Sequence, residues 1–248
     1  MKILVCISHV PDTTSKITFR NENKEFEDSG VTFVINPYDE FCLTKAMMLK
    51  ESSAATVTVL NVGPASTEPT LRKALAIGAD DAVRIDTTAS DSFYVAKQIA
   101  SHIDSVGYDI VFLGRESIDY NGGAVPGMVA ELTNTSFVNA CIGLELNGSD
   151  VTLVREIDGG KETLKSSLPI IVAGQKGLVE EKDLRIPSMR GIMMARKKAL
   201  NVVPAVDSEN KMVVELFELP KAKAACKMIS PDNVEELVEL LHREAKVI

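Results

Sequence analysis

The sequence predicts an α/β fold built on an open, mostly parallel, doubly wound sheet. Short runs of β-branched and aliphatic residues, each the length of one strand, occur at 3–7, 56–62, 82–85 and 110–113. Helical patterns separate these runs, and this alternation is typical of βαβ units whose strands are covered on both faces. After residue 132, hairpin-like segments replace the helices, which predicts an inserted β-hairpin region followed by a C-terminal extension.

Three helices are expected between these strands, at 37–51, 67–77 and 91–103. Asn36 is a favoured N-cap residue, Pro37 suits the first helical position, and Gly78 marks the end of the second helix. The third helix places apolar residues on one face, as a helix packed on a sheet requires: Ala96, Ile99, Ala100 and Ile103.

The second half of the chain predicts a hairpin, a buried strand and a tail. The segments 141–146 and 151–156 flank Asn147-Gly148, a favoured two-residue hairpin turn, and Gly159-Gly160 indicates another turn. The expected elements that follow are a buried strand at 168–174, a basic helix at 189–200, a strand at 212–216, and an amphipathic helix capped by Ser230-Pro231-Asp232. We assign residues 1–205 to one α/β domain and 206–248 to the C-terminal extension.

Composition excludes several classes of function. The chain has 248 residues and a formal net charge of −8. This acidic balance argues against nucleic acid as a principal partner, because phosphate binding needs a clustered basic face. No apolar run reaches the roughly 18 residues of a membrane span, and the opening run breaks at Ser8-His9 before a signal-peptide core forms. We therefore expect a cytoplasmic protein, or a protein of the mitochondrial matrix in a eukaryote, without membrane insertion.

The residues that usually carry catalysis or bind metals are scattered. No CxxC pair occurs, so neither a disulfide framework nor a zinc site is expected from the four cysteines: Cys6, Cys42, Cys141 and Cys226. Ser8 and His9 are adjacent but point apart, and no nucleophile-elbow motif is present. We expect no catalytic residues, no metal and no enzymatic activity of this chain alone.

The loop at 114–127 is the most informative candidate site. It follows a buried strand, contains Gly122 and Gly123, and precedes a helix expected at 128–132, so backbone N–H groups and a helix N-terminus could hold a phosphate. Ligands of open α/β sheets bind at such strand ends. The loop lacks the spacings of the dinucleotide fingerprint and of the P-loop. A plain glycine turn is the alternative.

A second candidate is the basic, methionine-rich segment at 189–198. Methionines repack easily against different partners, and positive charge attracts acidic ones, so the segment could be a docking surface. The alternative is a solvated face above a stripe of core residues. The residues concerned are Met189, Arg190, Ile192, Met193, Met194, Arg196, Lys197 and Lys198.

With these segments, the sequence resembles the β subunit of electron transfer flavoproteins over nearly its whole length. The matching stretches occur in the family's order: 10–13, 35–39, 71–80, 114–119, 154–160, 168–169 and 192–198. The resemblance implies an open sheet like that of adenine-nucleotide α-hydrolases. It also implies a heterodimer in which an α subunit holds the redox-active FAD, while this chain supports that FAD and binds AMP.

The resemblance also implies site residues. The adenine and ribose would be surrounded by Cys6, Asn36, Pro37, Tyr38, Asp39 and Val62. The phosphate would be wrapped by the segment from Gly114 to Val125, including Arg115, Asp119, Asn121, Gly122, Gly123 and Ala124. Glu156 would lie at the subunit interface near the flavin. In the recognition segment at 177–200, Met189 would be the docking anchor, accompanied by Ile192, Met193, Arg196 and Lys197.

The implied partners are acyl-CoA or other flavin dehydrogenases as electron donors and a quinone oxidoreductase as acceptor. Bifurcating members of the family hold a second FAD in place of AMP. The stretch 119–125 departs from their Gly-Asp-Thr-Ala-Gln-Val pattern, which favours AMP. Two further alternatives are a universal-stress-type ATP-binding module and a purely structural subunit with an empty nucleotide site.

Overall fold

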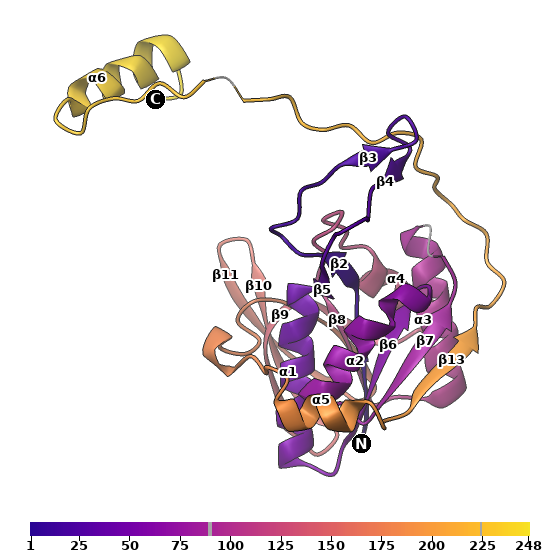
Figure 1. Cartoon of the computed structure of the whole chain (residues 1–248). Helices are drawn as coiled ribbons and strands as arrows, with labels where there is room; N and C mark the ends of the chain where they lie inside the picture. The colour runs from indigo at the N-terminus through magenta and orange to yellow at the C-terminus, as the bar shows by residue number, and fades with distance from the viewer. Residues whose placement is uncertain (89–90, 224) are drawn as a thin grey trace.

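The computed structural model describes residues 1–88, 91–223 and 225–248 (Figure 1). Its centre is a sheet of nine strands. From one edge to the other these are β11 (Gly160–Ser167), β10 (Asp150–Ile157), β9 (Ser136–Asn147), β12 (Ile170–Gly174), β8 (Ile110–Gly114), β1 (Lys2–Cys6), β6 (Thr56–Val62), β7 (Asp81–Asp86) and β13 (Leu200–Pro204). Neighbouring strands are parallel from β9 to β13, whereas β10 is antiparallel to both of its neighbours. The predicted α/β fold with a mostly parallel sheet is confirmed.

Helices cover both faces of the sheet, which makes it doubly wound. On β1, Ile3 and Val5 belong to one hydrophobic cluster, which also holds buried residues of α1 (Pro37–Ser52) and α2 (Glu68–Ile77). Leu4 and Cys6 point to the opposite face and pack with residues of α3 (Ser92–Val106) and α4 (Val125–Leu132). Successive residues of a strand alternate between faces, so a continuous apolar run serves both clusters.

The predicted helices of the first half are confirmed within a few residues. Gly78 ends α2 with a φ of 148°, and the apolar face predicted for α3 is buried. Asp91 caps α3, because its side chain accepts a hydrogen bond from the backbone N–H of Tyr94 at 2.7 Å. A short 3₁₀ turn, η1 (Ala65–Thr67), precedes α2, and α4 begins at Val125 rather than at Met128.

Small elements decorate this domain. Two short strand pairs, β2 (His9–Pro11) with β5 (Phe33–Ile35) and β3 (Phe19–Arg20) with β4 (Glu25–Phe26), lie outside the main sheet. A second 3₁₀ turn, η2 (Glu181–Asp183), follows β12. The predicted hairpins are confirmed as β9, β10 and β11, which extend the parallel sheet beyond β12.

Three predictions for the C-terminal third were wrong. The helix expected over 189–200 ends early, as α5 (Met189–Ala195), because Leu200–Pro204 pairs with β7 as the edge strand β13. Residues 212–216 form no strand, since the N–H groups of Lys211 and Met212 donate to the Asp91 carboxylate instead of to a sheet edge. The last helix, α6 (Val234–Glu239), is capped by Asn233, not by 230–232, and continues as a π-helical turn, η3 (Leu240–Ala245).

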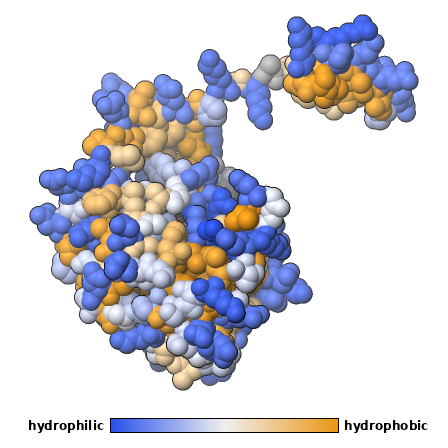
Figure 2. Space-filling model, turned by 180° about the vertical axis from the view of Figure 1, so that it is seen from behind, coloured by the Kyte–Doolittle hydropathy of each residue, from blue (hydrophilic) through white to orange (hydrophobic). Residues whose placement is uncertain are grey.

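The C-terminal extension contacts the domain and then leaves it (Figure 1). The ring of Phe217 stacks on Phe19 with centroids 4.9 Å apart, and its N–H donates to the carbonyl of Asn23 at 2.8 Å. Farther along, α6 stands apart from the domain (Figure 1) and carries exposed apolar residues, among them Val234 and Val238. Figure 2 shows this apolar surface on the segment that projects from the body.

No helix in the described ranges is long and apolar enough to cross a membrane.

Candidate functional site

The main candidate site is a pocket of about 730 Å³ at the carboxyl ends of β1, β6 and β8. From β1 the chain builds the sheet outward through β6, β7 and β13 on one side, and through β8 and β12 on the other. The crevice between β1 and β8 is therefore the topological switch point, where open α/β sheets bind ligands. The predicted site residues that line this pocket are Cys6, Asp39, Val62, Gly114, Asp119, Gly122 and Val125.

Asp39 joins the ends of β1 and β8 beneath the pocket. Its carboxylate is buried and accepts hydrogen bonds from the N–H of Ser8 at 2.7 Å and from the N–H of Gly114 at 2.8 Å. Burial raises the pKa of Asp39 to about 7, although these hydrogen bonds oppose the shift. A Cβ at Gly114 would lie 2.5 Å from Asp39 Oδ1, so the close approach requires glycine.

Asn36 holds the loop that follows β8. Its amide Nδ2 donates to the carbonyl of Glu116 at 2.9 Å, and its Oδ1 accepts from the N–H of Ile118 at 3.3 Å. Its side chain does not cap α1, although Asn36 occupies the N-cap position. Asn36 thus positions the loop, and with Pro37 and Tyr38 it lies beside the pocket rather than among the residues that line it.

The loop itself is tightened by a bridge between Ser117 and Gly122, in which the N–H of Ser117 donates to the carbonyl of Gly122 at 3.0 Å. The loop leads directly into α4, whose first residues, Val125 and Pro126, line the pocket. Asn121 adopts a φ of 50° in this turn. Asn121, Gly123 and Ala124 are not among the lining residues.

Arg115 points away from the pocket. Its Nη1 donates to Gln175 Oε1 at 2.7 Å, and its Nε lies 3.6 Å from Glu116 Oε2. The amide of Gln175 in turn donates to Glu156 Oε2. The structure therefore brings Arg115 and Glu156, both predicted as site residues, into one polar network centred on a buried glutamine.

Sequence reasoning missed part of the pocket wall. His9 and Phe33, whose rings stack with centroids 4.2 Å apart, line it, as do Met212 and Val214 of the C-terminal extension. Asn61 also lines it, although it occupies a strand that was interpreted as apolar core. An amide within an otherwise apolar strand was the available signal for Asn61, whereas the folding back of residues 212–214 has no local signature.

Comparison with known proteins identifies the family. The model of the electron transfer flavoprotein domain matches residues 24–208. The chain is 35% identical to the electron transfer flavoprotein subunit beta of Bacillus subtilis (strain 168) over the full length of both. Identity is also 35% to the protein of the same name from Syntrophomonas wolfei, over 91% of this chain and 88% of the relative. It is 34% to the mitochondrial subunit beta of Oryza sativa subsp. japonica, over all of both chains.

The chain belongs to the electron transfer flavoprotein β-subunit family. This membership confirms the resemblance that the sequence motifs indicated, and it sets aside the universal-stress-type alternative. The role of the family is electron transfer by a flavoprotein.

The methionine-rich segment of this family member is exposed, not a core stripe. Met189 is 78% exposed and Met193 is 68% exposed, and the buried residue of α5 is Ala195. Arg196 and Lys197 are exposed as well. The segment therefore presents exposed apolar side chains and positive charge, and we call its exposed residues at 189–197 the α5 surface.

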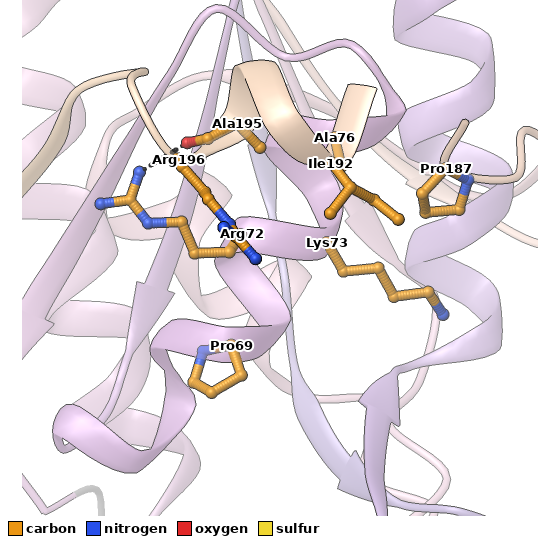
Figure 3. Close-up of a pocket in the computed structure, with 8 residues that line it drawn as sticks. All are labelled: Pro69, Arg72, Lys73, Ala76, Pro187, Ile192, Ala195 and Arg196. Carbon is orange, nitrogen blue, oxygen red and sulfur yellow. Dashed lines mark hydrogen bonds between the residues drawn. The ribbon is translucent and has the colours of Figure 1, made fainter. Parts of the chain in front are cut away.

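A second pocket, of about 500 Å³, lies between α2 and α5 (Figure 3). It is lined by Pro69, Arg72, Lys73, Ala76, Pro187, Ile192, Ala195 and Arg196. Arg72 stabilises the C-terminal end of α5, because its Nη1 donates to the carbonyls of Ala195 at 2.8 Å and Lys198 at 2.7 Å. Lys198 is also structural, since its Nζ donates to the carbonyl of Leu75 at 3.0 Å. The pocket thus has an apolar floor and a basic rim.

The histidine and cysteine side chains of this family member make contacts within the fold or are free thiols. The imidazole of His9 lies 2.7 Å from Thr70 Oγ1, and burial lowers its pKa. Over residues 1–88, 91–223 and 225–248, no group of three or more His, Cys, Asp or Glu side chains could hold a metal ion. Cys6, Cys42 and Cys141 are buried free thiols, and Cys226 is an exposed one.

Proposed function

We propose that the chain is the β subunit of a heterodimeric electron transfer flavoprotein, that it binds AMP in the strand-end pocket, and that an α subunit holds the redox-active FAD. The observation that carries this proposal is the pocket at the switch point, which is lined by residues of the loop after β8 and by the first residues of α4. In that loop, Ser117 Oγ is buried and lacks a partner in the described part of the chain, and such an atom is costly unless a ligand or water satisfies it.

The charge of the pocket wall defines how a nucleotide would be held. Carboxylates line it, namely Asp28, Asp39, Asp91, Glu116 and Asp119, and no lysine or arginine is among the described lining residues. A phosphate would therefore depend on backbone N–H groups of the loop and on the N-terminus of α4. Carboxylates accept hydrogen bonds from hydroxyls, so they suit the ribose.

A second candidate is a second FAD in the same pocket. The pocket continues beyond the strand ends to Phe33, Met212 and Val214, which gives room for a ligand longer than a mononucleotide.

Electron transfer would depend on the FAD, which supplies the redox chemistry when it is bound. This chain would contribute by helping to position the FAD and by docking partner proteins. Glu156, fixed by Gln175, would lie at the interface with the α subunit. The α5 surface would dock acyl-CoA or other flavin dehydrogenases, with Met189 as anchor and Arg196 attracting acidic groups, and a quinone oxidoreductase would accept the electrons.

The test is to produce this chain together with its α partner, purify the complex and identify the released nucleotides by mass spectrometry. We expect one FAD and one AMP per heterodimer. Two FAD would establish the second candidate. A complex with one FAD and no further nucleotide, or the failure of the two chains to associate, would refute the proposal.

A further inference from the structure

Residues 211–217 of the C-terminal extension, which we call the strap, border the strand-end pocket. Met212 and Val214 line the pocket, whereas Val213, between them, is not among the lining residues and is 82% exposed. Alternate residues of an extended chain face opposite sides, so the strap turns two apolar side chains toward the pocket. A segment distant in sequence from the strand ends therefore forms one wall of the site.

One end of the strap is fixed to the N-terminus of α3. The carboxylate of Asp91, which also lines the pocket, accepts hydrogen bonds from the N–H of Lys211 and, at 3.0 Å, from the N–H of Met212. The ammonium of Lys211 lies 5.8 Å from the centre of the Phe93 ring, within the range of a cation–π contact. These contacts hold the start of the strap against the side of the pocket that α3 forms.

The other end of the strap is fixed to the hairpin of β3 and β4. The rings of Phe217 and Phe19 stack with centroids 4.9 Å apart, and the N–H of Phe217 donates to the carbonyl of Asn23 at 2.8 Å. In the same hairpin, Arg20 Nη1 lies 3.7 Å from Oδ1 of Asp28, which lines the pocket. The far end of the strap is thus held close to another part of the pocket wall.

The strap is exposed between its two fixed ends. Residues 211–216 are exposed, and Phe217 is half-buried. Figure 1 shows the extension rising from β13 to β3 and β4, and seven residues of extended chain reach at most about 25 Å. Because such a segment opens when only its own contacts break, the strap can detach while the sheet stays folded.

We propose that the strap completes the nucleotide site and retains the bound nucleotide, which leaves only after the strap has detached. This inference rests on the proposed nucleotide-binding function and adds the C-terminal extension to that site. Met212 is 66% exposed and Val214 is 51% exposed, so a nucleotide in the pocket buries apolar surface against the attached strap. The nucleotide therefore favours the attached state, and the attached strap in turn slows its release.

The first experiment uses the unmodified full chain. Hydrogen exchange measured by mass spectrometry compares the nucleotide-free chain, obtained by mild denaturation and refolding, with the same chain saturated with AMP. We expect AMP to slow exchange at the amides of Lys211, Met212 and Phe217 by at least about fivefold, because it stabilises the attached state. The amides of α6, which stands apart from the domain, are the internal control and should exchange equally in both samples (Figure 1).

The second experiment loosens the strap without touching the nucleotide. Phe217→Ala and Phe19→Ala each remove the ring stack, and neither residue lines the pocket. Release of radiolabelled AMP, chased with excess unlabelled AMP, should be about tenfold faster in each variant. The double variant should release AMP no faster than either single one, because both changes remove the same contact. Leu219→Ala, at a position 61% exposed in the same extension, is the matched control and should keep the rate of the unmodified chain.

The association rate of AMP separates a loosened strap from a damaged pocket. A detached strap leaves the pocket open, so AMP should enter both phenylalanine variants at least as fast as it enters the unmodified chain. Faster release combined with slower association would indicate a distorted pocket and would overturn the proposal.

The remaining outcomes separate this inference from the function on which it rests. Unchanged exchange of the strap on addition of AMP, or release of AMP from both phenylalanine variants at the rate of the unmodified chain, would overturn the role of the strap and leave nucleotide binding intact. Failure of the unmodified chain and of its heterodimer to bind AMP would refute the AMP site itself, and the role of the strap with it.

Discussion

The carboxylate of Asp91 joins Met212 to the N-terminus of α3. Oδ1 accepts the N–H of Tyr94 at 2.7 Å, and Oδ2 accepts the N–H of Met212 at 3.0 Å and that of Lys211. One buried side chain therefore caps a helix and fixes the C-terminal extension against the pocket, which Met212 lines. A second side chain, Gln98, also holds the start of the extension. Its Oε1 accepts from the N–H of Val206 at 2.8 Å, and its Nε2 donates to the carbonyl of Val206 at 2.9 Å.

Asp91→Ser is expected to release the extension while keeping α3 capped. Serine is a good N-cap residue but lacks the second oxygen that holds the extension. Two hydrogen bonds to a charged group are lost, each worth about 1.5–3 kcal/mol, so the amides of Lys211 and Met212 should exchange with solvent faster by at least tenfold. Hydrogen exchange by mass spectrometry measures this. Asp207→Ser, at an exposed position of the same extension, is the control. Unchanged exchange in Asp91→Ser would show that Asp91 does not hold the extension.

Gly114→Ala is expected to destabilise the fold at the pocket. The added Cβ would lie 2.5 Å from Asp39 Oδ1 and 2.7 Å from Tyr38 Cβ, so the strand end must shift. Overpacking of this kind costs about 1–3 kcal/mol. Thermal or urea unfolding measures the loss. Gly122→Ala, in the loop that follows, is the control, because a Cβ there meets nothing within 4 Å. Equal stability of the two variants would show that the close approach is not required.

The pKa of Asp39 predicts a pH dependence of stability. Burial raises this pKa to about 7, above its unfolded value near 4, so the folded chain holds the proton more tightly than the unfolded chain does. Stability should therefore be highest below about pH 4 for this group, decline as pH rises to about 7, and stay level above that, a loss of about 4 kcal/mol. Asp39→Asn should flatten this interval in urea unfolding measured from pH 4 to pH 8 without nucleotide. Asp28→Asn, an exposed carboxylate of the same pocket, should keep the slope of the unmodified chain.

Much of the first half was predictable because local and tertiary signals agree there. The apolar run of β1 serves two clusters at once, and α1 begins at Pro37 as predicted, although the Asn36 side chain bonds the loop after β8 instead of capping the helix. The switch-point pocket followed from the order of strands and helices and from the glycines after β8. Site residues that were predicted at the ends of strands, such as Gly114, therefore line the pocket.

The remaining features depend on contacts distant in sequence. Leu200–Pro204 forms a strand because it pairs with the edge of β7, and no local sequence pattern indicates this pairing. Residues 212–216 have the residue pattern of a strand. The N–H groups of Lys211 and Met212, at the start of that segment, nevertheless donate to the Asp91 carboxylate. Arg115 belongs to the predicted phosphate segment, but a glutamine 60 residues away binds its guanidinium. Residue type alone cannot distinguish these outcomes.

Electrostatic docking at the α5 surface predicts the behaviour of two variants. Arg196→Glu reverses an exposed charge of the α5 surface, so electron transfer from an acyl-CoA dehydrogenase to the reconstituted heterodimer should slow several-fold at low salt, and less at high salt, because salt screens exposed charges. Met189→Ala should slow it at all salt concentrations, since its contribution is apolar. Lys97→Glu makes the same change in net charge on α3, on the opposite face of the sheet, and should leave the rate unchanged. Stopped-flow measurement of flavin reduction provides the rates. If Arg196→Glu and Lys97→Glu behave alike, the overall charge of the chain, not the α5 surface, attracts the partner.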